Sequence, residues 1–261
     1  MATNSHVRAP RRRPDRSAGR AERPFRALPN RRVLALAAAA AVALAGTLIG
    51  IGVSGSGSGA PKPASITGAA ATRSLLAGIP QHGLVLGRLD APVKLVEYGD
   101  LQCPICREFA VGTLPTIIRD YVRPGKVQLA FRGLAFLGPD SQKALRAVIA
   151  AGMQNRAWHL IDLLYRNQGA ENSGWVSDAL LRSALLKIPG IDVADVLTEE
   201  RAVATTTAMR TAQQQAEQAM GSELRTPTFE VARSGRRLEI LPLQSLAASA
   251  FTPTLDRLLA G

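Results

Sequence analysis

Hydrophobic positions follow a strand-like pattern in several short runs of the chain. Apolar runs bounded by glycine or proline predict strands, because residues of a buried strand are apolar and β-branched and turn residues end them. Two further runs flank Ser234-Gly235 and predict a terminal hairpin. The predicted strands are residues 84–86, 93–98, 127–131, 228–232 and 237–241.

Helical spacing dominates the intervening chain. From about residue 139 to residue 221 apolar side chains recur three and four residues apart, as in Leu145, Val148 and Ile149. A separate helix is predicted from the segment 103–106 towards Tyr121, with Pro115 breaking or kinking it. Residues 201–220 and 245–259 are predicted helices too. The order of elements predicts an α/β fold with an all-helical insertion at about 139–221.

The first 60 residues have a different character. Residues 33–53 carry no charge, a length that can cross a hydrocarbon core of roughly 30 Å as one transmembrane helix. Residues 1–32 hold ten arginines against two acids, so most of the net charge of +12 lies there. A basic tail can bind nucleic acid or anionic lipid, but its position before an apolar segment favours a cytoplasmic flank.

These features predict a membrane-anchored protein. We expect a basic disordered tail at 1–32, a signal-anchor at 33–53, a flexible linker at 54–79 and one domain at 80–261. A cleaved secretory signal and a cleaved twin-arginine signal are the alternatives. All three place the domain outside the cytoplasm, at the cell membrane in the first case, where disulfides persist.

The chain has only two cysteines, Cys103 and Cys106, in the sequence Cys-Pro-Ile-Cys. Two thiols with this spacing can close and reopen a disulfide ring and so exchange two electrons with another protein. A helix that starts there favours the Cys103 thiolate, so we expect Cys103 to attack and Cys106 to resolve. A structural staple and a metal site are the alternatives, but the ring is small and few further ligands exist, so no metal is expected.

Two more positions accompany the cysteines. Glu97 lies within the predicted strand 93–98, where burial would raise its pKa and fit it to exchange a proton with Cys106. The alternative is a solvent-facing glutamate. Thr226-Pro227 immediately precedes the predicted terminal hairpin, a position where proline is also unremarkable.

Taken together, VEYGDLQCPICREFA, a helical block of about 80 residues and TPTF before a hairpin resemble the DsbA-like branch of the thioredoxin superfamily. The resemblance implies a thioredoxin-like fold with a helical insertion over about residues 80–260. It also implies that Pro227 is in cis beside the cysteines and that Pro104, Ile105 and Thr226 meet the substrate. The implied activity forms disulfides in exported proteins without a bound cofactor, with a quinone-linked membrane partner as reoxidant.

The chain departs from that pattern at two positions. Ile105 stands where the strongest oxidants of the family have histidine, so a milder oxidant is expected. Arg225 stands where glycine is common; Arg225 or Arg107 could supply the missing positive charge, or both could be surface arginines. A reductase or isomerase on the same fold remains an alternative, as does a non-catalytic tethered chaperone or metal carrier.

Overall fold

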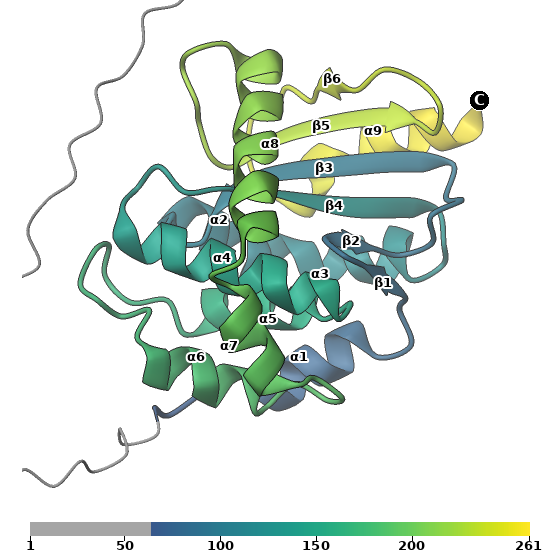
Figure 1. Ribbon diagram of the computed structural model, residues 1–261. Coiled ribbons are helices and arrows are strands. Elements are labelled where there is room, and N and C mark those ends of the chain that lie inside the picture. Colours follow the sequence, from purple (N-terminus) through teal and green to yellow (C-terminus); the bar gives the residue numbers. More distant parts are fainter. Residues whose placement is uncertain (1–63) are drawn as a thin grey trace, which may run out of the picture. The chain divides into compact units, whose positions relative to one another are not determined.

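A β-sheet of six strands organises residues 64–261, the part of the chain that the computed structural model describes. The order across the sheet is β1-β2-β4-β3-β5-β6 (Figure 1). Strands β3 and β4 are parallel, and every other neighbouring pair is antiparallel. The strands are β1 (Gln81–His82), β2 (Val85–Leu86), β3 (Val93–Asp100), β4 (Val127–Leu134), β5 (Thr228–Arg233) and β6 (Glu239–Ile240).

Strand β3 is buried on both faces. Successive side chains of a strand point to opposite faces, so Leu95 and Glu97 share one face and Val96 and Tyr98 the other. Leu95 belongs to the main core, whereas Val96 and Tyr98 form a second, smaller core with Leu134 of β4 and Ala216. Residues 93–98 therefore form a central strand, because the side chains on each of its faces are buried in a hydrophobic core.

Helices cover the two faces of the sheet (Figure 1). On one face α8 (Val203–Met220) lies across the strands and supplies Ala216 to the second core. On the other face lie α9 (Ala248–Ala260) and the helical stretch that follows the cysteines. An aromatic cluster joins these two to the sheet, with the Phe109 and Phe229 rings 4.7 Å apart and the Phe229 and Phe251 rings 5.0 Å apart.

The helical stretch after Cys103 runs on to Val122, but it is not a regular α-helix. Two short α-helices alternate with π-helical turns, and Pro115 is accommodated in the first turn of α3 rather than breaking the stretch. A π-turn immediately before a proline shifts the hydrogen-bond pattern so that the missing N–H is tolerated. The segments are α2 (Pro104–Glu108), η1 (Phe109–Thr113), α3 (Leu114–Ile117) and η2 (Ile118–Val122).

The predicted helical insertion is confirmed. Its helices pack beside the sheet and bury large apolar side chains, among them Trp158 and Tyr165. Helix α8 closes the insertion and returns the chain to β5. The preceding helices are α4 (Pro139–Met153), α5 (Ala157–Arg166), α6 (Asp178–Leu185) and α7 (Val193–Glu199).

One boundary expected from the sequence is wrong. We expected residues 54–79 to be a flexible linker, but α1 (Ala69–Leu76) lies within that range and packs against α5. The Thr72 hydroxyl donates to the buried Asp162 carboxylate at 2.5 Å, which fixes the helix in place. The expected tail at 1–32 and anchor at 33–53 lie outside the described residues, and no helix in 64–261 is long and apolar enough to cross a membrane.

Candidate active site

Cys103 is the N-cap residue of α2, at the end of the loop that leaves β3. Its Sγ accepts a hydrogen bond from the backbone N–H of Cys106 at 3.4 Å, because Pro104 starts the helix and turns that N–H towards it. Both cysteines are free thiols. Cys103 is 6% exposed and Cys106 is fully buried, so the expected order of exposure is confirmed.

The two thiols have opposite acidities. The pKa of Cys103 is lowered to about 6, chiefly by the hydrogen bond with the Cys106 side chain, with a further contribution from the Cys106 backbone N–H. Burial raises the pKa of Cys106 well above its ordinary value, and the bond to Cys103 adds to this. At neutral pH Cys103 is therefore mostly a thiolate and Cys106 a thiol, which suits attack at Cys103.

The Thr226-Pro227 peptide is cis, as the resemblance implied. The Cys103 Sγ lies 3.5 Å from the carbonyl oxygen of Thr226, so this loop faces the reactive sulfur. Both loop residues are partly exposed. The structure thus brings together the cysteines and the downstream Thr-Pro pair that the sequence singled out.

Glu97 lies beneath the cysteines and is 1% exposed. Burial raises the pKa of Glu97 to about 8, and the nearby Cys103 contributes in the same direction. Its Oε1 atom has no hydrogen-bond partner among the described residues. A Cβ added to Gly99 would lie 3.0 Å from this oxygen and 2.7 Å from the Phe131 ring, so a glycine at 99 leaves room for the carboxyl group.

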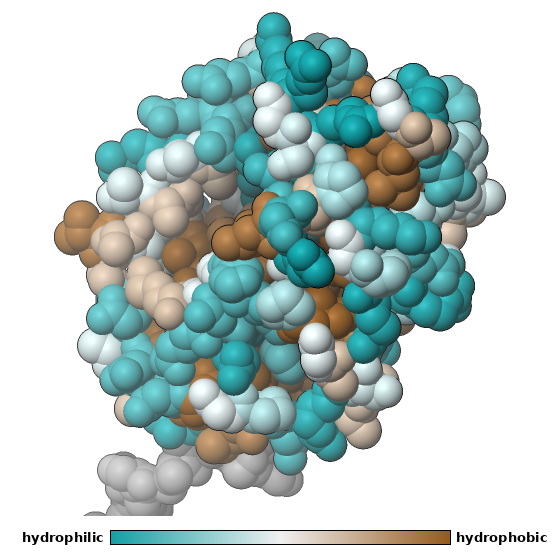
Figure 2. Space-filling model, turned by 90° about the vertical axis from the view of Figure 1, so that its right-hand side faces the viewer, coloured by the Kyte–Doolittle hydropathy of each residue, from teal (hydrophilic) through white to brown (hydrophobic). Residues whose placement is uncertain are grey.

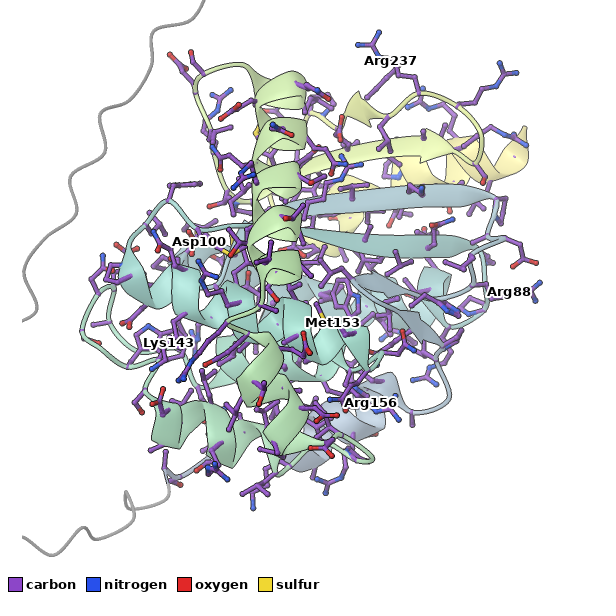
Figure 3. All side chains as sticks on the ribbon, viewed as in Figure 1. Arg88, Asp100, Lys143, Met153, Arg156 and Arg237 are labelled. Atoms are coloured by element: carbon purple, nitrogen blue, oxygen red, sulfur yellow. The ribbon has the colours of Figure 1, made fainter. Side chains whose placement is uncertain are left out.

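A group of polar residues holds the loop before Cys103, and the sequence pattern did not predict it. The Asp100 carboxylate, labelled in Figure 3, accepts from the Gln102 N–H at 2.9 Å and from the Ser141 hydroxyl at 2.6 Å. The Gln102 side chain accepts from the Asn172 N–H at 2.6 Å. Gln168 donates to the loop carbonyls as well. Ser141, Gln168 and Asn172 come from the insertion, far from the cysteines in sequence.

The residues that depart from the family pattern lie on the surface. Ile105 is 49% exposed between the two cysteines and offers only an apolar surface. Arg107 is exposed and its Nε donates to the carbonyl oxygen of Tyr165 at 3.1 Å. Arg225 is exposed in the loop before Thr226. Neither arginine is among the main groups that lower the pKa of Cys103, which favours the alternative that both are surface arginines.

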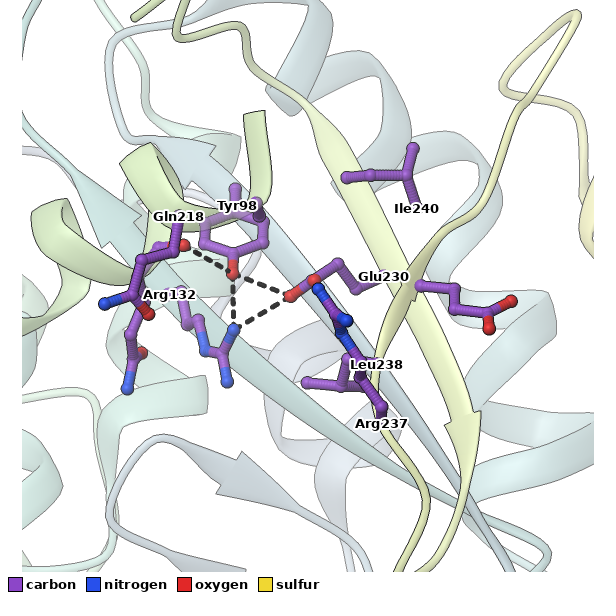
Figure 4. Close-up of a pocket in the computed structure, with 10 residues that line it drawn as sticks. Tyr98, Arg132, Gln218, Glu230, Arg237, Leu238 and Ile240 are labelled. Atoms are coloured by element: carbon purple, nitrogen blue, oxygen red, sulfur yellow. Dashed lines mark hydrogen bonds and ion pairs between the residues drawn. The ribbon is translucent and has the colours of Figure 1, made fainter. Parts of the chain in front are cut away.

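Two cavities lie near the central strands. One of about 530 Å³ is on the α8 face, where the Tyr98 hydroxyl, Arg132 and Glu230 bond to each other (Figure 4). Since side chains alternate along β3, it lies across the sheet from Glu97. The other, of about 510 Å³, adjoins Pro227 and is lined mainly by apolar residues. No group of three or more potential metal-ligating side chains occurs within 64–261.

This fold and a dithiol opposite a cis-proline define a thioredoxin-type protein. The chain belongs to the thioredoxin family, because residues 80–235 match the model of that family. It is similar to probable disulfide bond formation protein D of Bacillus cereus, with 40% identity over 111 residues, 41% of this chain and 51% of that protein. The chain thus spans about half the length of the curated relatives it matches.

Solved structures show the same fold. BdbD from Bacillus subtilis has a TM-score of 0.59 at 24% identity, covering 70% of this chain and 98% of that one. DsbA from Chlamydia trachomatis has a TM-score of 0.58 at 20% identity, covering 67% and 90%. The resemblance to the DsbA-like branch is therefore confirmed at the level of family and fold.

Proposed function

We propose that this protein is an extracytoplasmic thiol–disulfide oxidoreductase that forms disulfides in exported proteins. The geometry around Cys103 carries the proposal. Its sulfur is reached by the Cys106 N–H on one side and faces the Thr226 carbonyl on the other. The Cys106 N–H stabilises the thiolate and makes Cys103 a good leaving group, and stabilising the reduced form makes the disulfide form an oxidant.

The reaction has two exchange steps. A client thiolate attacks Sγ of Cys103 in the Cys103–Cys106 disulfide, which forms a mixed disulfide and releases Cys106 as a thiolate. A second client thiolate then attacks the client sulfur of the mixed disulfide, which closes the client disulfide and releases Cys103. The client loses two electrons and the cysteine pair gains them. Glu97, protonated at neutral pH, gives a proton to Cys106 and later regains it.

The surroundings of Cys103 suit an extended client segment. The backbone of the partly exposed Thr226 can pair with such a segment, while Pro104 and the exposed Ile105 contact it from the α2 side. The apolar cavity beside Pro227 has room for one of its side chains. We place the domain outside the cytoplasm, anchored by residues 33–53, and propose a quinone-linked membrane protein as the reoxidant. The basic tail before the uncharged segment 33–53 supports the anchor and its orientation, and the reoxidant is what the family resemblance implies.

The reduction potential of residues 64–261 tests the direction of the reaction. A pKa of about 6 for Cys103 predicts a potential between about −270 mV for thioredoxin and about −120 mV for the strong oxidant DsbA. A value at the thioredoxin end would favour the reductase alternative instead. In cells, the Cys106→Ala variant should accumulate mixed disulfides with exported proteins through Cys103. A Cys103→Ala, Cys106→Ala double variant, which must trap nothing, is the control.

A further inference from the structure

The backbone that leads into Cys103 is held by one side chain of the helical insertion. Gln168, just beyond the end of α5, donates its Nε2 amide to the carbonyl oxygen of Leu101 at 2.8 Å and to that of Cys103 at 3.2 Å. We propose that Gln168 is a positioning residue for the Cys103 thiolate. The inference rests on the proposed redox function of the cysteine pair.

The two carbonyl groups fix the geometry of the N-cap. The Cys103 carbonyl also accepts from the Arg107 N–H at 3.1 Å, so donors from the helix and from the insertion hold the same oxygen. The same Gln168 amide also holds the Leu101 carbonyl, two residues before Cys103. With both peptide planes fixed, the Cys103 side chain keeps the orientation in which the Cys106 N–H reaches its sulfur at 3.4 Å. Rotation of either plane would lengthen that bond and weaken the stabilisation of the thiolate.

Other contacts from the insertion do not duplicate this one. The Tyr165 hydroxyl donates to the Asp100 carbonyl at 3.3 Å, and Arg107 donates to the Tyr165 carbonyl at 3.1 Å. Both flank the loop without reaching the carbonyls of Leu101 or Cys103. Within residues 64–261, Gln168 is the sole side chain that donates to either oxygen. Its loss therefore leaves the loop attached but removes the restraint next to the sulfur.

The test is Gln168→Met, which keeps the length of the side chain and removes the amide. The thiolate–thiol equilibrium of Cys103 should shift roughly three- to tenfold towards the thiol, because the Cys106 N–H then bonds less well to the sulfur. The pKa of Cys103 should rise accordingly. The ultraviolet absorbance of the thiolate, recorded as a function of pH, measures this pKa. The redox equilibrium with glutathione should shift by a similar factor towards the disulfide form. A tenfold shift corresponds to about 30 mV towards a more reducing potential.

Gln154→Met is the matched control. Gln154 also follows a helix of the insertion, and its side chain bonds to the backbone of Asp192 at 3.0 and 2.7 Å. A purely structural role for Gln168 would make both variants alike, with lower stability and an unchanged thiol pKa and potential. That result would overturn the inference. If Gln168→Met fails to fold, Gln168→Leu is measured instead; failure of both while Gln154→Met folds would overturn it too.

The wild-type protein separates this inference from the proposed function. If its cysteines form no reversible disulfide with glutathione, the proposed function fails. If they do, and the Gln168 variants match wild type in pKa and potential, the positioning role alone fails.

Discussion

Cys103 and Cys106 lie in one turn of helix, yet their surroundings shift the two thiol pKa values in opposite directions. Cys103 is at the N-cap, where a backbone N–H and the neighbouring thiol donate to its sulfur. Cys106 is one turn further in, where burial disfavours its charged form. The difference follows from position in the helix, because unpaired N–H groups occur only at its start. It makes one thiol the nucleophile and the other the resolving group.

The Cys106→Ala variant should raise the pKa of Cys103. The Cys106 thiol is the largest cause of the lowering to about 6, whereas the backbone N–H survives the substitution. We expect an increase of roughly one to two units, measured as the pH dependence of iodoacetamide alkylation. Thr228→Ala, which alters a hydroxyl bonded to the Arg225 carbonyl in the same loop, is the control. If the alkylation rate of Cys106→Ala still changes with a midpoint near pH 6, the Cys106 thiol is not the main cause of the lowered pKa of Cys103.

Glu97 should make the stability of the oxidised protein depend on pH. With the cysteines reduced, burial and a smaller contribution from Cys103 raise its pKa to about 8, against 4.5 when unfolded. Burial persists in the disulfide form and keeps the pKa raised there, which adds stability that is fully present below pH 4.5 and is lost as the pH rises through the folded-state pKa. The disulfide form is the one to use, because its cysteines do not titrate.

Urea unfolding at pH 5 and pH 8 measures this effect. The free energy of unfolding of the wild type should fall between these values by about 2–4 kcal/mol more than that of Glu97→Gln. Glu199→Gln, which alters an exposed acid, should behave as the wild type. Equal pH dependence in wild type and Glu97→Gln would mean that Glu97 is ionised in the folded state.

At the scale of elements, the helices and strands that could be predicted are those whose sequence signals lie within the element itself. Strand β3 has an apolar run between Pro92 and Gly99, and the start of α2 is set by Cys103 and Pro104, so neither needs distant residues. Helix α1 was not predicted, because residues 54–72 are rich in glycine, serine, alanine and proline, a composition typical of a linker. It is ordered by contacts made far away in the chain, such as Thr72 with Asp162.

The same distinction separates the parts of the site. The cysteines and Glu97 lie within ten residues of each other, and Thr226-Pro227 stands out by its place before a hairpin. Their approach to one another could be predicted through the family resemblance. Gln168 and Asn172 could not be found, because glutamine and asparagine in a connecting segment carry no spacing signal. Only the packing of the insertion against the sheet shows what they bond to.

Helix α1 gives a test of these distant contacts. Thr72→Val should lower the free energy of unfolding by about 1–2 kcal/mol, since the buried Asp162 carboxylate loses a donor. Arg166 still pairs with Asp162 at 2.7 Å, which limits the loss. Amide hydrogen exchange should also become faster in 69–76. Thr207→Val, on the exposed surface of α8, is the control, and equal effects of both variants would argue against an anchoring role for Thr72.

At the scale of the whole molecule, charge and hydrophobicity are distributed unevenly. Residues 64–261 contain the fold and the site. The end of the sheet away from Asp100, seen in Figure 2, shows hydrophobic residues mainly in gaps between hydrophilic ones. Most of the net charge of +12 belongs to residues 1–32, before the uncharged segment 33–53. This division fits an enzyme domain held at a membrane by a separate anchor, with its dithiol on the side where disulfides persist.

The anchor and the orientation can be tested together in bacterial cells. The full chain should stay with membranes through an alkaline wash, because 21 uncharged residues are long enough to span the bilayer. A membrane-impermeant maleimide should label Cys103 in intact cells after mild reduction, and a chain starting at residue 64, made in the cytoplasm, should be labelled only after lysis. A soluble, shortened product would show a cleaved signal instead of an anchor. Labelling of the full chain only after lysis would place the dithiol in the cytoplasm, where an oxidase of exported proteins cannot act.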